Sequence, residues 1–428
     1  MNNNPSSLKK DWLIALAGGI GVIVLATVYY SLVLEHPTKS AVMPQEAPEI
    51  AQLEDAIKEK DAPLKNFLDL TSYYTQAVRE TGDTAYFANV ETVLNEAKKR
   101  FGKDDPDIQI AEAILAIGRH DFIEAEALAT KAIITNPNSA HYYGVQSDAL
   151  VELGRYEEAE EALQMMVDIR SDYGSYSRIA YLRELRGDTE GAIDLMQKAL
   201  DSGSAIKEHE AWAEVEVGRL LFSANMPNAK RHFDKALVAV PEYTQSFLWL
   251  GKLAYAEGNK EKALEYFTKA YIAAPTITNA ESLYAYAKAE NDTELADSYA
   301  KIIDTAYRIS QRQKNNVDLE YGRFLLEEGN VAEAETYAKS AYENRPNIYS
   351  AELMAKVSLA KNDIVAARKF SDESLKLDSN DASLFYTRAL IEKASGDNKS
   401  MRLYAEKVRQ LDPYFLKIHE SALNEMLL

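Results

Sequence analysis

Apolar side chains recur three and four residues apart through most of the chain, which is the spacing of one face of a helix. The stretch from Pro241 to Pro275 shows the pattern clearly. Phe247, Leu250 and Ala254 form one such face and predict a first helix. The interval between the two prolines leaves room for a second helix.

A turn and a second apolar stripe complete this unit. Gly258-Asn259 breaks the first helix, because both residues favour turns and helix ends. Ala263, Phe267 and Ala270 then form a facing stripe on a second helix, which a proline ends. The sequence therefore predicts a hairpin of two helices.

The small residue that opens the second stripe returns at nearly regular intervals, with longer ones before the fourth and seventh copies. These positions are Ala125, Ala159, Ala192, Ala229, Ala263, Ala296, Ala334, Ala367 and Met401. The period predicts nine hairpins over 106–413, a degenerate hairpin over 65–105 and a capping helix over 414–428. A single hairpin cannot bury its stripe alone, so the hairpins should stack into a solenoid.

The order large-x-x-Leu-Gly-x-x-medium, then Ala-x-x-x-Phe-x-x-Ala and Pro, together with the period, resembles the tetratricopeptide repeat. The resemblance implies an all-α, right-handed α-solenoid of about nine to ten helix-turn-helix hairpins. It also implies that the first helix of each hairpin lines a concave groove that binds proteins. The residue directly after the small packing position should then face this groove.

The candidate groove combines basic and apolar side chains from four first helices. It comprises Trp212, Arg219, Phe222, Leu248, Lys252, Tyr255, Leu319, Arg323, Leu326, Tyr349, Lys356 and Leu359. Such a surface would suit a partner segment that carries carboxylates and apolar anchors. In the alternative, the basic residues only solubilise a scaffold and pair locally with Glu216, Glu320 or Glu352.

An uncharged apolar run from Trp12 to Leu34 precedes the repeats and is long enough to cross a bilayer as a helix. It predicts an uncleaved transmembrane signal anchor, with a cleaved signal peptide as the alternative. Two lysines precede the run and one follows closely, which places residues 1–11 in the cytoplasm and the repeats outside. The proline-containing segment 35–64 predicts a linker with a short helix over 50–60.

Composition narrows the function. The chain has 48 basic and 67 acidic residues, a net charge of −19, which disfavours nucleic acid as a partner. Its lack of cysteine excludes disulfides and thiolate chemistry. Its six histidines show no metal-binding spacing, and no phosphate-binding or nucleophile motif is present. We therefore expect no enzymatic activity, no metal and no cofactor.

Together these patterns predict a single-pass membrane protein that binds other proteins. The first hypothesis is a bacterial inner-membrane protein whose repeats face the periplasm and scaffold an envelope assembly. By analogy, pilus, secretion, polysaccharide-export and outer-membrane biogenesis machineries are examples. The alternative is a cytosol-facing receptor that captures client segments at a membrane. The sequence leaves self-association of copies open.

Overall fold

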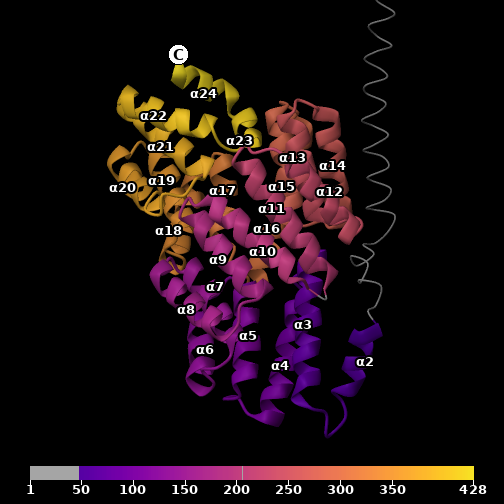
Figure 1. Ribbon diagram of the computed structural model, residues 1–428. Helices are drawn as coiled ribbons and strands as arrows, with labels where there is room; N and C mark the ends of the chain where they lie inside the picture. Colours follow the sequence, from indigo (N-terminus) through magenta and orange to yellow (C-terminus); the bar gives the residue numbers. More distant parts are fainter. Residues whose placement is uncertain (1–47, 205) are drawn as a thin grey trace, which may run out of the picture. The chain divides into compact units, whose positions relative to one another are not determined.

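The computed structural model describes residues 48–204 and 206–428, and all regular secondary structure in these residues is α-helical. The helices run from α2 (Pro48–Ala56) to α24 (Glu420–Leu427) (Figure 1). This confirms the predicted all-α solenoid. The predicted anchor over 12–34 lies outside the described residues, and no helix within them is both long and apolar enough to span a membrane.

Nine consecutive hairpins occupy the repeat region, each with an odd-numbered first helix and an even-numbered second helix. They pair α5 (Pro106–Gly118) with α6 (Phe122–Thr135), α7 (Ala140–Glu152) with α8 (Tyr156–Ile169), α9 (Tyr173–Leu185) with α10 (Thr189–Ser202), α11 (Lys207–Ser223) with α12 (Ala229–Ala239), α13 (Thr244–Ala256) with α14 (Lys260–Ala273), α15 (Ile277–Ala289) with α16 (Thr293–Arg312), α17 (Asp318–Glu327) with α18 (Val331–Asn344), α19 (Ile348–Ala360) with α20 (Ile364–Ser374), and α21 (Ala382–Ser395) with α22 (Asn398–Arg409). A hairpin of α3 (Leu64–Thr81) and α4 (Tyr86–Phe101) precedes them.

The two ends of the described chain differ in detail from the sequence expectation. The short linker helix covers Pro48–Ala56 instead of 50–60. The single capping helix expected after residue 413 is two helices, α23 (Pro413–Ile418) and α24, which meet at His419. The chain changes direction there because α23 packs on α13 while α24 packs on α22. The imidazole of His419 fills the bend by packing against the ring of Tyr386, with 4.4 Å between centroids.

In two successive hairpins, α11–α12 and α13–α14, a large ring of the second helix lies directly on a glycine of the first helix. Phe267 of α14 is fully buried, and a Cβ at Gly251 of α13 would lie only 2.6 Å from its ring. The same contact occurs one hairpin earlier, where a Cβ at Gly218 would lie 2.5 Å from the ring of Phe233. Any larger residue at either glycine would push the two helices apart, because protein cores have no free space to absorb it.

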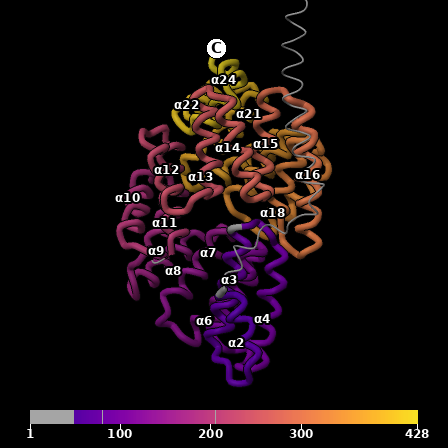
Figure 2. The backbone as a smooth tube through the Cα atoms, turned by 90° about the vertical axis from the view of Figure 1, so that its right-hand side faces the viewer, coloured from indigo at the N-terminus to yellow at the C-terminus, as the bar shows by residue number. Residues whose placement is uncertain are grey.

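The stacked hairpins wind far enough for the array to contact itself (Figures 1 and 2). Turns within the amino-terminal hairpins meet loops between the carboxyl-terminal hairpins at five successive places, which we call the seam. The contacts join Gly82 with Thr276, Arg119 with Asn316, Gly154 with Pro346, Gly187 with Asp378, and Ser223 with Asp412. Their separation along the sequence is nearly the same at all five places, as expected for two successive turns of one superhelix.

A buried arginine forms the polar centre of the seam. The Arg345 side chain is 7% exposed. Its guanidinium donates to the carboxylate of Glu152 at 2.7 Å and to that of Glu320 at 3.1 Å, and it lies over the ring of Phe122. Beside it, the backbone N–H of Ile348 donates to the phenol oxygen of Tyr156 at 3.1 Å. One arginine therefore links the α7–α8 hairpin to the α17–α18 hairpin.

The longest interval between repeats builds another part of the seam. The wide spacing between Ala296 and Ala334 gives α16 a length of 20 residues, against 11 to 14 for the other second helices of the nine hairpins. The extra turn carries the chain to Asn316, whose N–H donates to the carbonyl of Arg119 at 2.8 Å. The insertion thus brings the loop after α16 to the turn after α5.

Candidate functional site

The inner face is the surface that the first helices α9, α11, α13, α19 and α21 form together with α23, and it carries a cavity of about 220 Å³, which we call the inner cavity. Six of its lining residues come from six different elements: Glu184, Arg219, Trp249, Tyr349, Asp381 and Phe415. The neighbouring Tyr181 is 38% exposed, yet desolvation raises the pKa of its phenol. Tyr181 therefore reaches solvent although protein surrounds much of its ring.

The predicted groove residues all lie in the interior or at its margin, and none is exposed. Phe222, Leu248, Tyr255 and Leu319 are buried in the hydrophobic core. The half-buried residues are Trp212, Arg219, Lys252, Arg323, Leu326, Tyr349, Lys356 and Leu359. Of the twelve, only Arg219 and Tyr349 line the inner cavity.

Carboxylates on the same helix and on the preceding first helix neutralise Arg219. Its two terminal nitrogens donate to both oxygens of Glu184, each at 2.6 Å, and Nε donates to Glu216 at 2.8 Å. This confirms the alternative of local pairing with Glu216. A bidentate guanidinium with a third acceptor has little remaining capacity for a carboxylate from a partner.

Glu352 forms ion pairs with two further basic residues of the predicted groove, Lys356 and Arg323. It is 1% exposed and accepts from Lys356 at 2.8 Å and from Arg323 at 3.2 Å. Burial alone would raise its pKa, but these two positive charges hold the pKa at about 2. The expected pairing partner Glu320 instead binds Arg345 at the seam.

Lys252 is different because an aromatic face holds its charge. Its ammonium nitrogen lies 4.1 Å from the ring centroid of Trp249 and 5.7 Å from that of Tyr414. Desolvation lowers the pKa of Lys252, and the charge of Asp412 partly offsets this. The basic character that the sequence suggested for the groove is therefore largely satisfied within the chain.

The sequence reasoning missed the acidic side of the inner face. Glu184 could have been found, because it lies 35 residues before Arg219, which is one repeat. Trp249 directly follows the predicted groove residue Leu248, but a helix face chosen by spacing omits it. Asp381 and Phe415 had no local signal, because only the winding of the superhelix brings their helices to the cavity.

A buried carboxyl of α15 should make the stability of the fold depend on pH. Glu281 of α15 accepts a hydrogen bond from the hydroxyl of Tyr307 at 2.6 Å. Burial, with the negative charges of Glu327 and Glu320, raises the pKa of Glu281 from 4.5 to about 7 despite that hydrogen bond. Because the unfolded chain releases this proton at a lower pH than the folded chain does, folding becomes less favourable as the pH rises from about 4.5 to 7.

Replacing Glu281 by glutamine should therefore flatten the decline in stability over this pH interval and make the chain more stable at pH 8 than the unmodified protein. Urea unfolding at pH 5 and pH 8, followed by circular dichroism on the full chain in mild detergent, measures the difference. Glu261→Gln, at an exposed glutamate of α14, is the control and should leave the pH dependence unchanged. An equal effect of both substitutions would contradict this assignment.

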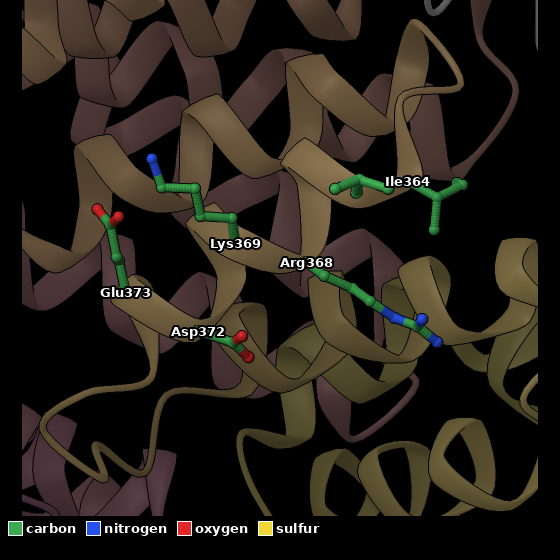
Figure 3. A pocket seen from close by; sticks show the side chains of 6 residues that line it. Ile364, Arg368, Lys369, Asp372 and Glu373 are labelled. Atoms are coloured by element: carbon green, nitrogen blue, oxygen red, sulfur yellow. The ribbon is translucent and has the colours of Figure 1, made fainter.

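A second hollow lies on the outer helix α20. Figure 3 shows its side chains spread along one helix rather than directed at one point: Ile364, Arg368, Lys369, Asp372 and Glu373. Arg368 is bound to Glu392, and Asp372 is bound to Arg388. Two of the four charged side chains here are already paired, and the four do not converge, so the inner cavity is the better candidate site.

Similarity to known families agrees with the helical geometry. Residues 110–174 and 219–276 match the family model of the tetratricopeptide repeat. These two segments therefore resemble tetratricopeptide repeats in sequence. The second contains the contact of Gly251 with Phe267, so the tetratricopeptide pattern accounts for the small residue under the ring.

The chain also aligns with several solved structures at low sequence identity. PilW, described as a widely conserved type IV pilus biogenesis factor, is 16% identical with a TM-score of 0.40, covering 47% of this chain and 94% of PilW. Pseudomonas aeruginosa pilF is 17% identical with a TM-score of 0.38, covering 49% and 95%. Yeast Tom70 is 14% identical with a TM-score of 0.33, covering 86% and 96%. No curated protein matches the sequence.

Proposed function

We propose that this chain is a non-enzymatic, membrane-anchored scaffold that holds protein partners on the periplasmic side of the bacterial inner membrane during envelope assembly. Pilus, secretion, polysaccharide-export and outer-membrane biogenesis machineries are the candidate pathways. The observation that carries the proposal is the inner face, where the first helices of five hairpins meet at the inner cavity. The uncharged run from Trp12 to Leu34, with two lysines before it, supports the anchor and its orientation.

The chemistry of the inner face suits binding of a peptide segment. Tryptophan, tyrosine and arginine dominate the energetics of protein interfaces, and Trp249, Tyr349 and Arg219 meet at the inner cavity. A cavity of about 220 Å³ admits part of a short segment but not a folded domain. The partner should therefore insert a short segment between the two turns of the superhelix.

Site-specific photocrosslinking in cells tests this binding mode. A photoreactive phenylalanine at Tyr181, on the inner face, should crosslink a partner protein. The same group at Ile272, which is 74% exposed on the second helix α14, is the matched control and should crosslink far less. Crosslinking at Ile272 alone would place the partner on the outer surface and overturn the proposal.

The orientation of the chain needs its own experiment. A reporter enzyme that is active only after export, fused after Leu428, should show activity. Activity of a reporter that works only in the cytoplasm would instead support the alternative, a cytosol-facing receptor for client segments. The two lysines before the apolar run and the single lysine after it leave this alternative open.

A further inference from the structure

The inner cavity carries two carboxylates whose second oxygen atoms accept no hydrogen bond from the residues that the structure describes. Oδ1 of Asp381 caps α21 by accepting from the N–H of Ser383 at 2.8 Å. Oδ1 of Asp412 caps α23 by accepting from the N–H groups of Tyr414 and Phe415, both at 3.0 Å. One oxygen suffices for each cap, so Oδ2 of each carboxylate is available to a ligand.

The charges around the cavity do not balance. Three acids line it, Glu184, Asp381 and Asp412, against the single base Arg219. Arg219 is engaged by Glu184 and by a further carboxylate on its own helix. Burial and the nearby charge of Glu352 raise the pKa of Asp381 to about 6, and the positive charges of Arg323 and Lys356 oppose this only in part.

The basic residues near the cavity form their own contacts elsewhere and do not pair with its excess of carboxylates. The ammonium of Lys252 lies over the Trp249 ring, and that of Lys356 is bound to Glu352. Arg323 is bound to Glu352 as well. The charge of Lys252 acts on Asp412, but no base among the described residues forms an ion pair with Asp381 or Asp412. An added positive charge would therefore find two carboxylates without an ion-pair partner.

The remaining walls are aromatic. Trp249, Tyr349 and Phe415 line the cavity from α13, α19 and α23. Aromatic faces attract guanidinium and ammonium groups, and this attraction strengthens where water is excluded. The volume of about 220 Å³ is below the roughly 300–1,000 Å³ of pockets for drug-sized ligands, so it fits one side chain rather than a larger molecule.

We propose that the inner cavity receives a single arginine or lysine side chain from a partner's peptide segment, with Asp381 and Asp412 as its counter-charges. The inference rests on the proposed scaffold function and names the chemistry of the bound segment. It reverses the sequence-based expectation of an acidic partner, because the basic groups of the groove already have carboxylate or aromatic contacts within the chain.

Peptide binding to the full chain in mild detergent tests this proposal. The probes are acetyl-Ala-Ala-Xaa-Ala-Ala-amide with arginine, lysine, glutamine or glutamate as Xaa. Trp249 lines the cavity and reports binding through its fluorescence once Trp12 and Trp212, the other two tryptophans, are replaced by phenylalanine. The arginine and lysine peptides should bind saturably, and the glutamine peptide should bind about tenfold more weakly because it lacks the charge.

A charge-removing variant separates binding from folding. Asp381→Asn combined with Asp412→Asn keeps both helix caps, because asparagine caps helices as well as aspartate does. This double variant should lose about tenfold in affinity for the arginine peptide and should bind the glutamine peptide as before. Asp363→Asn is the control, because Asp363 caps the outer helix α20 away from the cavity.

Two results would overturn the inference. One is preferential binding of the glutamate peptide, and the other is equal binding of the arginine and glutamine peptides. Failure of all four peptides, together with crosslinking at Tyr181 in cells, would reject the cationic side chain while leaving the scaffold function intact. Loss of both signals would reject the scaffold function itself.

Discussion

Replacing Arg345 by alanine should lower the free energy of unfolding by about 3 kcal/mol. The substitution leaves Glu152 and Glu320 facing each other across the seam without the cation that binds both. Breaking a buried ion pair from one side costs far more than the pair contributes, because the remaining charge stays desolvated. Urea unfolding of the full chain in mild detergent measures the loss.

Two further variants separate the charge effect from simple loss of contact. Lys198→Ala removes an exposed ion pair with Asp194 on α10 and should cost less than about 1 kcal/mol. Arg345→Met combined with glutamine at both Glu152 and Glu320 removes all three charges and should recover most of the stability. If the triple variant is as unstable as Arg345→Ala, uncompensated charge is not the cause.

Gly154→Ala should open the seam at its centre. A Cβ at Gly154 would lie 2.2 Å from the carbonyl oxygen of Pro346, so the two backbones must separate. Forcing extra volume into such a contact costs about 1–3 kcal/mol, in addition to about 1 kcal/mol of strain from the φ of +68°. Hydrogen exchange should accelerate at the amide of Asp412, which donates to the carbonyl of Ser223 farther along the seam.

Gly258→Ala is the matched control for this substitution. Gly258 ends α13 at a φ of +82°, but a Cβ there would meet no atom within 4 Å. The alanine should therefore cost only the backbone strain of about 1 kcal/mol and leave exchange at Asp412 unchanged. Equal losses of stability in the two variants would show that the seam contact is unimportant for the fold.

The hairpins were accessible to sequence reasoning because their determinants are local. Gly251 and Phe267 lie within one hairpin and reappear in neighbouring copies, so their contact follows from the period alone. The inward direction of Arg219 followed from the same rule, since it lines the inner cavity. What the rule could not supply was the partner of each inward side chain.

The seam and the acidic cavity could not be predicted because their determinants are far apart in sequence. Gly154 and Pro346 meet only if several hairpins each contribute the right small rotation to the winding. The spacing of residues within one hairpin does not predict the total rotation over several hairpins. The long interval before Ala334 was a visible irregularity, but its effect, the contact of Asn316 with Arg119, appears only in three dimensions.

The nearly constant separations across the seam also bear on how such a chain can change during evolution. An open solenoid can gain or lose a repeat, because each hairpin contacts only its neighbours. Here an additional hairpin between Gly154 and Pro346 would lie between the two partners of most seam contacts and would lengthen their separation by one repeat. Every contact whose partners flank the insertion would then be out of register at once. Duplication or deletion of a hairpin within this interval should therefore be selected against, whereas hairpins added beyond the last seam contact would be tolerated.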